Sequence, residues 1–300
     1  MNSKTNSWLP GYIALGITWG SSFLLIKWGL LSLSPFGVVF FRGFFGGLTL
    51  LAFSLITKQK LPKKLSEFGH LTVVALLMNS VPGYLFAVGE THVSSVTAGI
   101  INATTPLMTV LVISLAFREQ KINLNQGIGV FIGFIGVLFV TNVFSNKVSG
   151  DWIGYGELLL ATLCYGIAIP YSRRYVSPLG YSSTALATIQ VSASAIVLSP
   201  FLLFTTTFEN SWSAKSLIGM LLLGAVGTGF AYIWNYRNVT LAGATIASTV
   251  TYVTPVVAAI LGVLLLNEHV HLIQYIGGGF ILFSAALVQQ RIKLVGKKNG

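Results

Sequence analysis

Ten long apolar runs, separated by short polar breaks, constrain this chain more than any other feature. They cover residues 9–31, 36–57, 70–90, 94–117, 126–144, 152–172, 179–205, 216–236, 243–266 and 272–290. A helix needs about 20 mostly apolar residues to cross the hydrocarbon core of a bilayer, and each run is near that length. The runs are continuous, whereas the strands of a membrane β-barrel alternate apolar and polar residues. The pattern therefore predicts an all-α polytopic membrane protein with ten transmembrane helices.

The composition argues against the soluble alternatives. Only 8% of the residues are charged, against roughly 25% in an ordinary soluble domain. This leaves too little polar surface for a soluble enzyme or a nucleic-acid-binding module, so we expect no nucleic-acid partner. The single cysteine, Cys164, permits no internal disulfide and no thiolate metal cluster. The first run is too long for a signal peptide, so we predict a retained helix with Pro10 in its first turn.

The distribution of basic residues predicts the orientation. With the N-terminus inside, the outer loops hold only Lys147 and Lys215, and only Lys27 and Arg42 fall within the apolar runs. Every other lysine and arginine then lies in an inner segment, which satisfies the positive-inside rule. We therefore expect a multi-pass protein of the cell membrane with cytoplasmic N- and C-termini.

The chain contains an internal repeat. Residues 105–119 read TPLMTVLVISLAFRE, and residues 254–268 read TPVVAAILGVLLLNE. The pairs that match at one offset are Thr105/Thr254, Pro106/Pro255 and Glu119/Glu268, followed by Gly129/Gly278 and Phe131/Phe280. Chance similarity of two apolar helices is the alternative, but it does not explain a recurring proline and glutamate. The repeat divides the chain into residues 9–144 and 152–290. Because each half holds five helices, the second is predicted to be inverted.

Several segments resemble a known family. They are WGSSFLLIK (19–27), SPFGVVFFRG (34–43) and the two repeat ends, continued by QGIGVFIGFIGV (126–137) and YIGGGFILFSAAL (275–287). Their order and spacing resemble the ten-helix, EamA-type members of the drug/metabolite transporter superfamily. The resemblance implies a central cavity lined by helices one, three, four, six, eight and nine, with helices five and ten at the periphery. Asn267 departs from the pattern, because glycine is common at that position.

Polar and aromatic residues on these helices are the candidates for binding a substrate. They are Trp19, Ser22, Asn79, Tyr84, Asn102, Thr104, Tyr165, Tyr232, Trp234, Asn235, Thr251 and Tyr252. Amides and hydroxyls orient a polar metabolite, and aromatic faces accept apolar or cationic parts. Helix packing or an interfacial position is the alternative for any single aromatic residue.

Two prolines are predicted hinges. Pro106 and Pro255 lie within helices four and nine, where a missing N–H leaves the carbonyls of Asn102 and Thr251 free. Free backbone groups at membrane depth survive only beside protein or a water-filled cavity, so a substrate site and hinge is one interpretation. The other is a packing kink in which Thr105 or Thr254 satisfies the carbonyl.

Three charged residues fall within spans, where charge is costly and often functional: Lys27, Arg42 and Glu157. We predict an outer vestibule in which Glu157 pairs with one of the two cations and serves as a site for proton coupling. The remaining positive charge favours a carboxylate-bearing substrate. The alternative is that Lys27 snorkels outward and Arg42 fixes a helix end.

Other acidic and imidazole groups lie near helix ends. Glu119 and Glu268 are expected to cap the helix that follows each of them. Glu90, His92, His269 and His271 are expected to be solvated, and the histidines are too sparse for a metal site.

Glycines on helices five and ten indicate a close helix contact. Gly129, Gly133 and Gly277–Gly279 permit it, either within the chain or with a second copy. We therefore expect a monomer or a weak dimer.

These features favour a secondary-active or facilitative transporter that exports a small metabolite by alternating access around a central cavity. The resemblance implies export of an amino acid, a related compound or a drug, and a neutral amino acid is our first expectation. The chain has no nucleotide-binding P-loop, and we expect no cofactor, no metal and no catalytic residue. The alternatives are an uptake permease, for a nucleoside for example, and a membrane-embedded enzyme or sensor.

Overall fold

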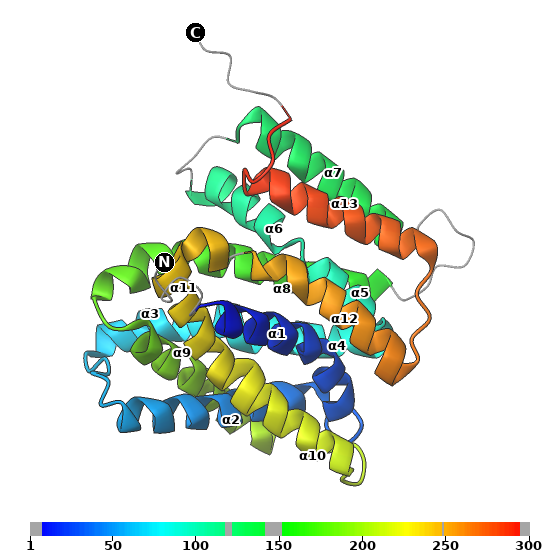
Figure 1. Cartoon of the computed structure of the whole chain (residues 1–300). Helices are drawn as coiled ribbons and strands as arrows, with labels where there is room; N and C mark the ends of the chain where they lie inside the picture. The colour runs from blue at the N-terminus through cyan, green and yellow to red at the C-terminus, as the bar shows by residue number, and fades with distance from the viewer. Residues whose placement is uncertain (1–7, 118–121, 142–151, 248, 295–300) are drawn as a thin grey trace.

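The structure is a computed structural model that describes residues 8–117, 122–141, 152–247 and 249–294, without the side chains of residues 236 and 243–246. The α-helices are α1 (Leu9–Gly29), α2 (Pro35–Ile56), α3 (Leu65–Ala75), α4 (Val81–His92), α5 (Ser95–Asn102), α6 (Thr105–Val112), α7 (Leu124–Val140), α8 (Trp152–Tyr171), α9 (Ser183–Leu198), α10 (Ala214–Leu221), α11 (Ala231–Ala247), α12 (Val250–Leu266) and α13 (Leu272–Val288). The π-helical and 3₁₀ segments are η1 (Leu76–Ser80), η2 (Ile113–Phe117), η3 (Ser172–Val176), η4 (Ser177–Leu179), η5 (Ser199–Leu203) and η6 (Leu222–Phe230). Figure 1 shows them side by side in one bundle.

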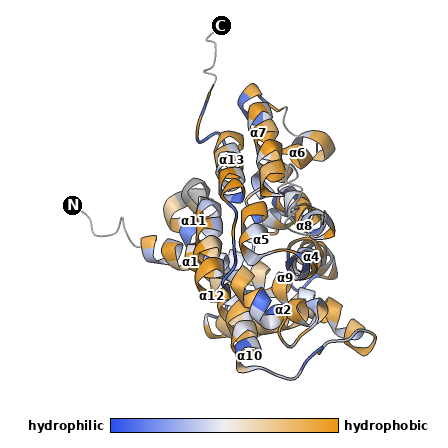
Figure 2. Ribbon diagram, turned by 90° about the vertical axis from the view of Figure 1, so that its right-hand side faces the viewer, coloured by the Kyte–Doolittle hydropathy of each residue, from blue (hydrophilic) through white to orange (hydrophobic). Residues whose placement is uncertain are grey.

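These segments join into the ten predicted apolar helices. Seven continuous helices, the longest being Ala214–Ala242, are long and apolar enough to cross a membrane. Three shorter apolar helices, Leu124–Val140, Val250–Leu266 and Leu272–Val288, bring the total in the described part of the chain to ten. Hydrophobic residues dominate the helices along most of their length (Figure 2). The prediction of an all-α polytopic membrane protein is confirmed.

The eighth predicted helix ends later than expected. We placed its end at residue 236, but α11 continues through Arg237 to Ala247, and the next helix begins at Val250. The segment from Arg237 to Gly243 is polar at its start but holds no proline, so nothing in it interrupts the backbone ladder. Helix three likewise begins at Leu65 rather than residue 70, because Glu67 accepts the backbone N–H of Lys64 at 3.2 Å and caps its first turn.

Helices α7 and α13 form a reciprocal antiparallel pair at one edge of the bundle (Figure 1). Near the start of α7, Gln126 donates from Nε2 to the carbonyl of Val288 at the end of α13 (3.5 Å). Near the start of α13, Gln274 donates from Nε2 to the carbonyl of Val140 at the end of α7 (3.3 Å). Each helix therefore satisfies a terminal carbonyl of its partner.

The glycines of this pair are reciprocal as well. A Cβ at Gly136 would lie 2.8 Å from the carbonyl oxygen of Gly277, and a Cβ at Gly277 would lie 2.6 Å from that of Gly136. The Ser284 hydroxyl donates to the carbonyl of Gly129 at 2.6 Å. The close contact permitted by these glycines is thus made within the chain. The helix bounds and capping glutamines relate α7 to α13 by 148 residues, so Gly129 corresponds to Gly277 rather than to Gly278.

Several other helix contacts also have a counterpart in which the two halves of the chain change places. Helix α1 packs against α12, and α8, at the equivalent place in the second half, packs against α6. Helix α1 also packs against α10, η6 and α11, whereas α8 packs against η1 and α4. Helices α2 and α9 pack against each other, as do α5 and α12.

We predict that Gly277→Ala lowers the thermal unfolding midpoint of the protein in detergent by roughly 2–10 °C, because the added Cβ forces α7 and α13 apart. Differential scanning fluorimetry of the purified chain measures the shift. Gly279→Ala is the matched control, since a Cβ at Gly279 meets no atom within 4 Å. Equal midpoints for the two variants would contradict the proposed contact.

Candidate functional site

Three polar side chains meet in the interior of the bundle. Gln190 on α9 donates from Nε2 to Oδ1 of Asn79 (2.7 Å) and to the hydroxyl of Tyr232 on α11 (3.3 Å). Asn79 donates from Nδ2 to the same hydroxyl at 3.5 Å. Gln190 is buried, whereas Asn79 and Tyr232 remain partly exposed. The cluster joins the first half of the chain, through Asn79, to the second half.

Asn79 lies in a widened turn with a clear local cause. Pro82 has no N–H to donate to the carbonyl of Met78, and the N–H of Val81 instead reaches the carbonyl of Leu76, five residues back. Such π-helical turns are uncommon and are frequent at functional sites. The segment η6, which directly precedes α11 and Tyr232, is π-helical as well.

Arg42 lies close to this cluster. Its Nε donates to Oγ1 of Thr228 at 3.1 Å, and its guanidinium interacts electrostatically with Tyr165 and Tyr232. The positive charge of Arg42 thus acts on both tyrosines. The predicted pairing of Arg42 with Glu157 stays a prediction.

Aromatic rings line the same region. Tyr165 stacks on Phe86, with ring centroids 6.1 Å apart, and Phe86 contacts Phe23 edge to face at 5.7 Å. Tyr165 is partly exposed, whereas both phenylalanines are buried. Amide, hydroxyl, guanidinium and aromatic groups thus converge from α1, α2, η1, α4, α8, α9 and α11.

Other predicted binding residues have structural roles. Trp19 and Trp234 pack against the buried cluster of Leu15, Ala231 and Val250. Their positions match the packing alternative.

The hydroxyl groups of two predicted residues donate hydrogen bonds within the protein. Ser22 donates to the carbonyl of Thr18 in its own helix at 3.2 Å, and Thr104 donates to Oγ1 of Thr162 at 3.2 Å. Both side chains are buried.

Four predicted residues lie outside the hydrogen-bonded cluster. Tyr84 is 44% exposed, and Asn235 is partly exposed. Tyr252 packs beside Leu107, Ala285 and Val288, where its buried hydroxyl has no hydrogen-bond partner among the described residues. Thr251 lines a separate cavity beside Pro106.

The two prolines have the same local arrangement. Thr105 donates from Oγ1 to the carbonyl of Asn102 at 2.8 Å, and Thr254 donates from Oγ1 to the carbonyl of Thr251 at 3.1 Å. The carbonyl freed by each proline is thus satisfied by the preceding threonine, as the second interpretation states. The first site also interrupts the helix, since α5 ends at Asn102 and α6 begins at Thr105, whereas α12 runs through Pro255 without a break.

A cavity of about 620 Å³ lies beside Pro106. Its lining residues are Thr105, Pro106, Thr109, Val110, Ile169, Thr251, Val288, Gln289, Gln290 and Arg291. Its lining is mostly apolar with a few polar side chains, and it comes from both halves of the chain.

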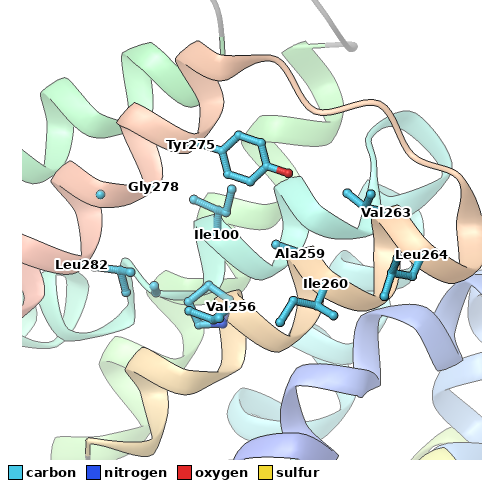
Figure 3. Close-up of a pocket in the computed structure, with 12 residues that line it drawn as sticks. Ile100, Val256, Ala259, Ile260, Val263, Leu264, Tyr275, Gly278 and Leu282 are labelled. Atoms are coloured by element: carbon cyan, nitrogen blue, oxygen red, sulfur yellow. The ribbon is translucent and has the colours of Figure 1, made fainter.

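A groove of about 570 Å³ opens between α5, α12 and α13. Figure 3 shows Ile100, Tyr275 and Leu282 facing Val256 and the other labelled side chains of α12. Tyr275 supplies the only side-chain polar atom of its lining. A polar metabolite would find almost no hydrogen-bonding partner here, so this groove is poorly suited to a polar substrate.

Lys27 and Glu268 both bind the short turn between α4 and α5. Lys27 donates from Nζ to the carbonyls of Glu90 and Val93, the latter at 2.9 Å. Glu268 accepts the backbone N–H groups of Ser95 (2.8 Å) and Val96 (3.0 Å) and the Ser95 hydroxyl (3.0 Å). The expectation that Glu268 caps the next helix is wrong, because it caps α5 from across the bundle, where the helix N-terminus favours an anion. The predicted pairing of Lys27 with Glu157 stays a prediction.

Glu90 is fully buried, with 0% exposure, so the expectation that it is solvated is wrong. A Cβ at the neighbouring Gly89 would lie 2.9 Å from Leu158 and 3.3 Å from the carbonyl oxygen of Gly154, which shows how closely α8 covers this turn. His92, His269 and His271 are exposed as expected.

The remaining acidic residues considered as candidates are Glu157 and Glu119. Glu157 on α8 is partly buried, and Glu119 lies outside the described residues. No group of three or more histidine, cysteine or acidic side chains forms a metal-binding arrangement within the described ranges.

Gln190 was not predicted from the sequence, and Glu90 was predicted to be solvated. Gln190 was overlooked because helix seven was not expected to line the cavity, although a glutamine between apolar residues is itself a signal. The burial of Glu90 depends on α8, which is distant in sequence and carries no mark of the contact beyond Gly154.

Comparison with known proteins supports the fold and the class. The EamA-like transporter family matches residues 6–142 and residues 152–289. The chain is 29% identical over 278 residues to the "Uncharacterized inner membrane transporter YedA" of Escherichia coli K12, covering 92% of this chain and 88% of that protein. It is 26% identical to an "Uncharacterized transporter" of Archaeoglobus fulgidus, covering 93% of this chain and 98% of that one.

A solved crystal structure shares the fold. It has a TM-score of 0.65 at 15% identity and covers 97% of this chain and 100% of its own. Together with ten apolar helices, the family matches establish a multi-pass membrane transporter. The chain belongs to the EamA-like transporter family.

Proposed function

We propose that this protein is a secondary-active or facilitative transporter that exports a small metabolite by alternating access. The observation that carries the proposal is the cluster of Asn79, Gln190 and Tyr232, because it joins the two halves of the chain through hydrogen bonds in the bundle interior. Transporters of this kind place the substrate between their repeats and rock one repeat against the other.

The reciprocal packing supports an inverted repeat of residues 9–144 and 152–290. Gln126 and Gln274 make equivalent bonds in opposite directions, and the neighbours of α1 and α8 exchange in the same way. Two similar halves provide two related conformations, which alternating access requires. The π-helical segments η1 and η6 occur in equivalent helices of the two halves.

The groups around the cluster favour a substrate with a carboxylate and an apolar or aromatic part. Arg42 supplies a fixed positive charge, Asn79 and Gln190 supply amides, and Tyr165 with Phe86 supplies an aromatic surface. Arginine binds carboxylates in a bidentate manner. An amino acid or a related compound has this combination, and a neutral amino acid is the first to test.

The remaining predictions extend this proposal. We infer a location in the cell membrane with cytoplasmic termini, a monomeric or weakly dimeric state, and no enzymatic activity. Proton coupling at Glu157 stays a prediction. An uptake permease is the second candidate, since hydrogen bonds at the cluster do not depend on direction.

We predict that Arg42→Gln raises the KM for a carboxylate substrate by about 10- to 100-fold, because a charge-assisted hydrogen bond contributes about 1.5–3 kcal/mol. Flux of labelled amino acids into proteoliposomes, with and without a pH gradient, measures the effect. Arg237→Gln is the control, because Arg237 is exposed on α11. Absence of saturable flux for every compound in a metabolite panel would contradict the transporter proposal.

We predict that Pro255→Ala slows transport several-fold while leaving substrate affinity nearly unchanged. Alanine restores the backbone hydrogen bond to Thr251 and stiffens α12 between its two ends. Single-turnover flux and equilibrium binding, measured on the same preparation, separate the two quantities. Pro10→Ala, in the first turn of α1, is the control, and equal rates for both variants would exclude a hinge at Pro255.

A further inference from the structure

Three charged side chains from distant parts of the sequence meet at the turn between α4 and α5. Glu90 lies in the last turn of α4, Lys27 reaches the turn from α1, and Glu268 reaches it from the segment after α12. The turn is therefore a point where one end of the bundle is held together. The Val93 N–H donates to the carbonyl of Gly89 at 3.0 Å and closes the last turn of α4.

Two of these charged side chains form hydrogen bonds with the backbone. Lys27 donates to carbonyls at the C-terminus of α4, where a cation is favoured, and Glu268 accepts from N–H groups at the N-terminus of α5, where an anion is favoured. The two formal charges balance each other across the turn.

Glu90, the third charged side chain, has no such hydrogen bond. Its side chain is fully buried, and neither carboxylate oxygen accepts a hydrogen bond from any described residue. An ionised carboxylate in such a place is strongly disfavoured, whereas the neutral acid is tolerated.

The charged and titratable groups around Glu90 come from every neighbouring element. Lys27 on α1, Arg42 on α2 and Glu268 after α12 interact with it electrostatically. Helix α8, which packs on α4, carries Tyr155, Glu157, Cys164, Tyr165 and Tyr171. Helix α4 itself carries Tyr84 and His92, and α5 carries no ionisable side chain. Lys27 donates from Nζ to two backbone carbonyls, and Arg42 donates from Nε to Thr228.

We propose that Glu90 is a proton-binding site, and that the proton on its carboxylate keeps this end of the bundle closed through Lys27. The assignment deepens the proposed transport function and rests on it for any role in coupling. The ligand is a proton, because the carboxylate has no access to solvent and no second acidic group beside it with free oxygens to hold a metal ion.

The consequence of losing the proton follows from the contacts of Lys27. An ionised Glu90 carboxylate competes with the two carbonyls for the same ammonium group. When Lys27 moves to the carboxylate, the last turn of α4 loses its cap, and the α4–α5 turn opens. The closed form binds one more proton than the open form, so alkaline pH favours opening by up to about tenfold per pH unit.

Hydrogen–deuterium exchange of the full chain in detergent tests this proposal directly. The reporter is the backbone of residues 90–98, measured between about pH 6 and about pH 9 and corrected for the intrinsic pH dependence of exchange. In the wild-type chain, the corrected exchange rises with pH. In Glu90→Gln, whose side chain cannot ionise, it stays low and flat.

Two further variants keep the test decisive. Lys27→Met removes the competing cation, so exchange of the turn is raised at both ends of the pH range and no longer changes with pH. Glu157→Gln, which replaces a neighbouring partly buried acid, keeps the wild-type response. A flat wild-type profile, or a response that persists in Glu90→Gln, would overturn the proposal; a response lost in Glu157→Gln would assign the proton to Glu157 instead.

The exchange measurement does not depend on substrate flux. If proteoliposomes show no flux but the turn opens with pH through Glu90, the transport proposal fails and the proton site stands. If flux is present and the exchange is insensitive to Glu90→Gln, the proton site fails and the transport proposal stands.

Discussion

Every backbone polar group at membrane depth needs a partner inside the protein, and much of this structure follows from that requirement. Helices satisfy most of these groups, but helix ends, prolines and turns leave some free. The chain supplies a side chain at several of these places. Threonine hydroxyls bind the carbonyls freed by Pro106 and Pro255, and glutamine amides bind the carbonyls that end α7 and α13. Lys27 and Glu268 do the same with full charges.

This requirement also explains why the charged residues are few and far from interchangeable. Lys27 donates to two backbone carbonyls, and Glu268 accepts hydrogen bonds at the start of α5. Arg42, by contrast, lies near Tyr165 and Tyr232, which remain partly exposed within the bundle, as does Asn79. A charge that caps a helix stabilises the fold, whereas a charge directed at partly exposed polar groups is available for a ligand.

The sequence was sufficient for the fold class because hydropathy and charge are properties of single segments. It predicted ten spans, and it predicted that Asn79, Tyr165 and Tyr232 belong to the candidate site, where they meet Arg42. It did not predict which acid is buried, because the cover over Glu90 depends on a close approach of α8 at Gly154. The contact between Glu268 and α5 was not predicted either, since α5 and the end of α12 lie far apart along the chain. The late end of α11 shows that polar residues alone do not end a helix.

The pair of α7 and α13 has a consequence for the lipid around it. Each of these helices has 17 residues and so spans about 26 Å, which is less than the roughly 30 Å of a typical hydrocarbon core. Both lie at one edge of the bundle (Figure 1). Lipids at that edge must thin to match the short helices, while lipids beside the longer α2 need not. The protein therefore imposes an uneven thickness on its annulus, and a thicker membrane deforms most where α7 and α13 meet it.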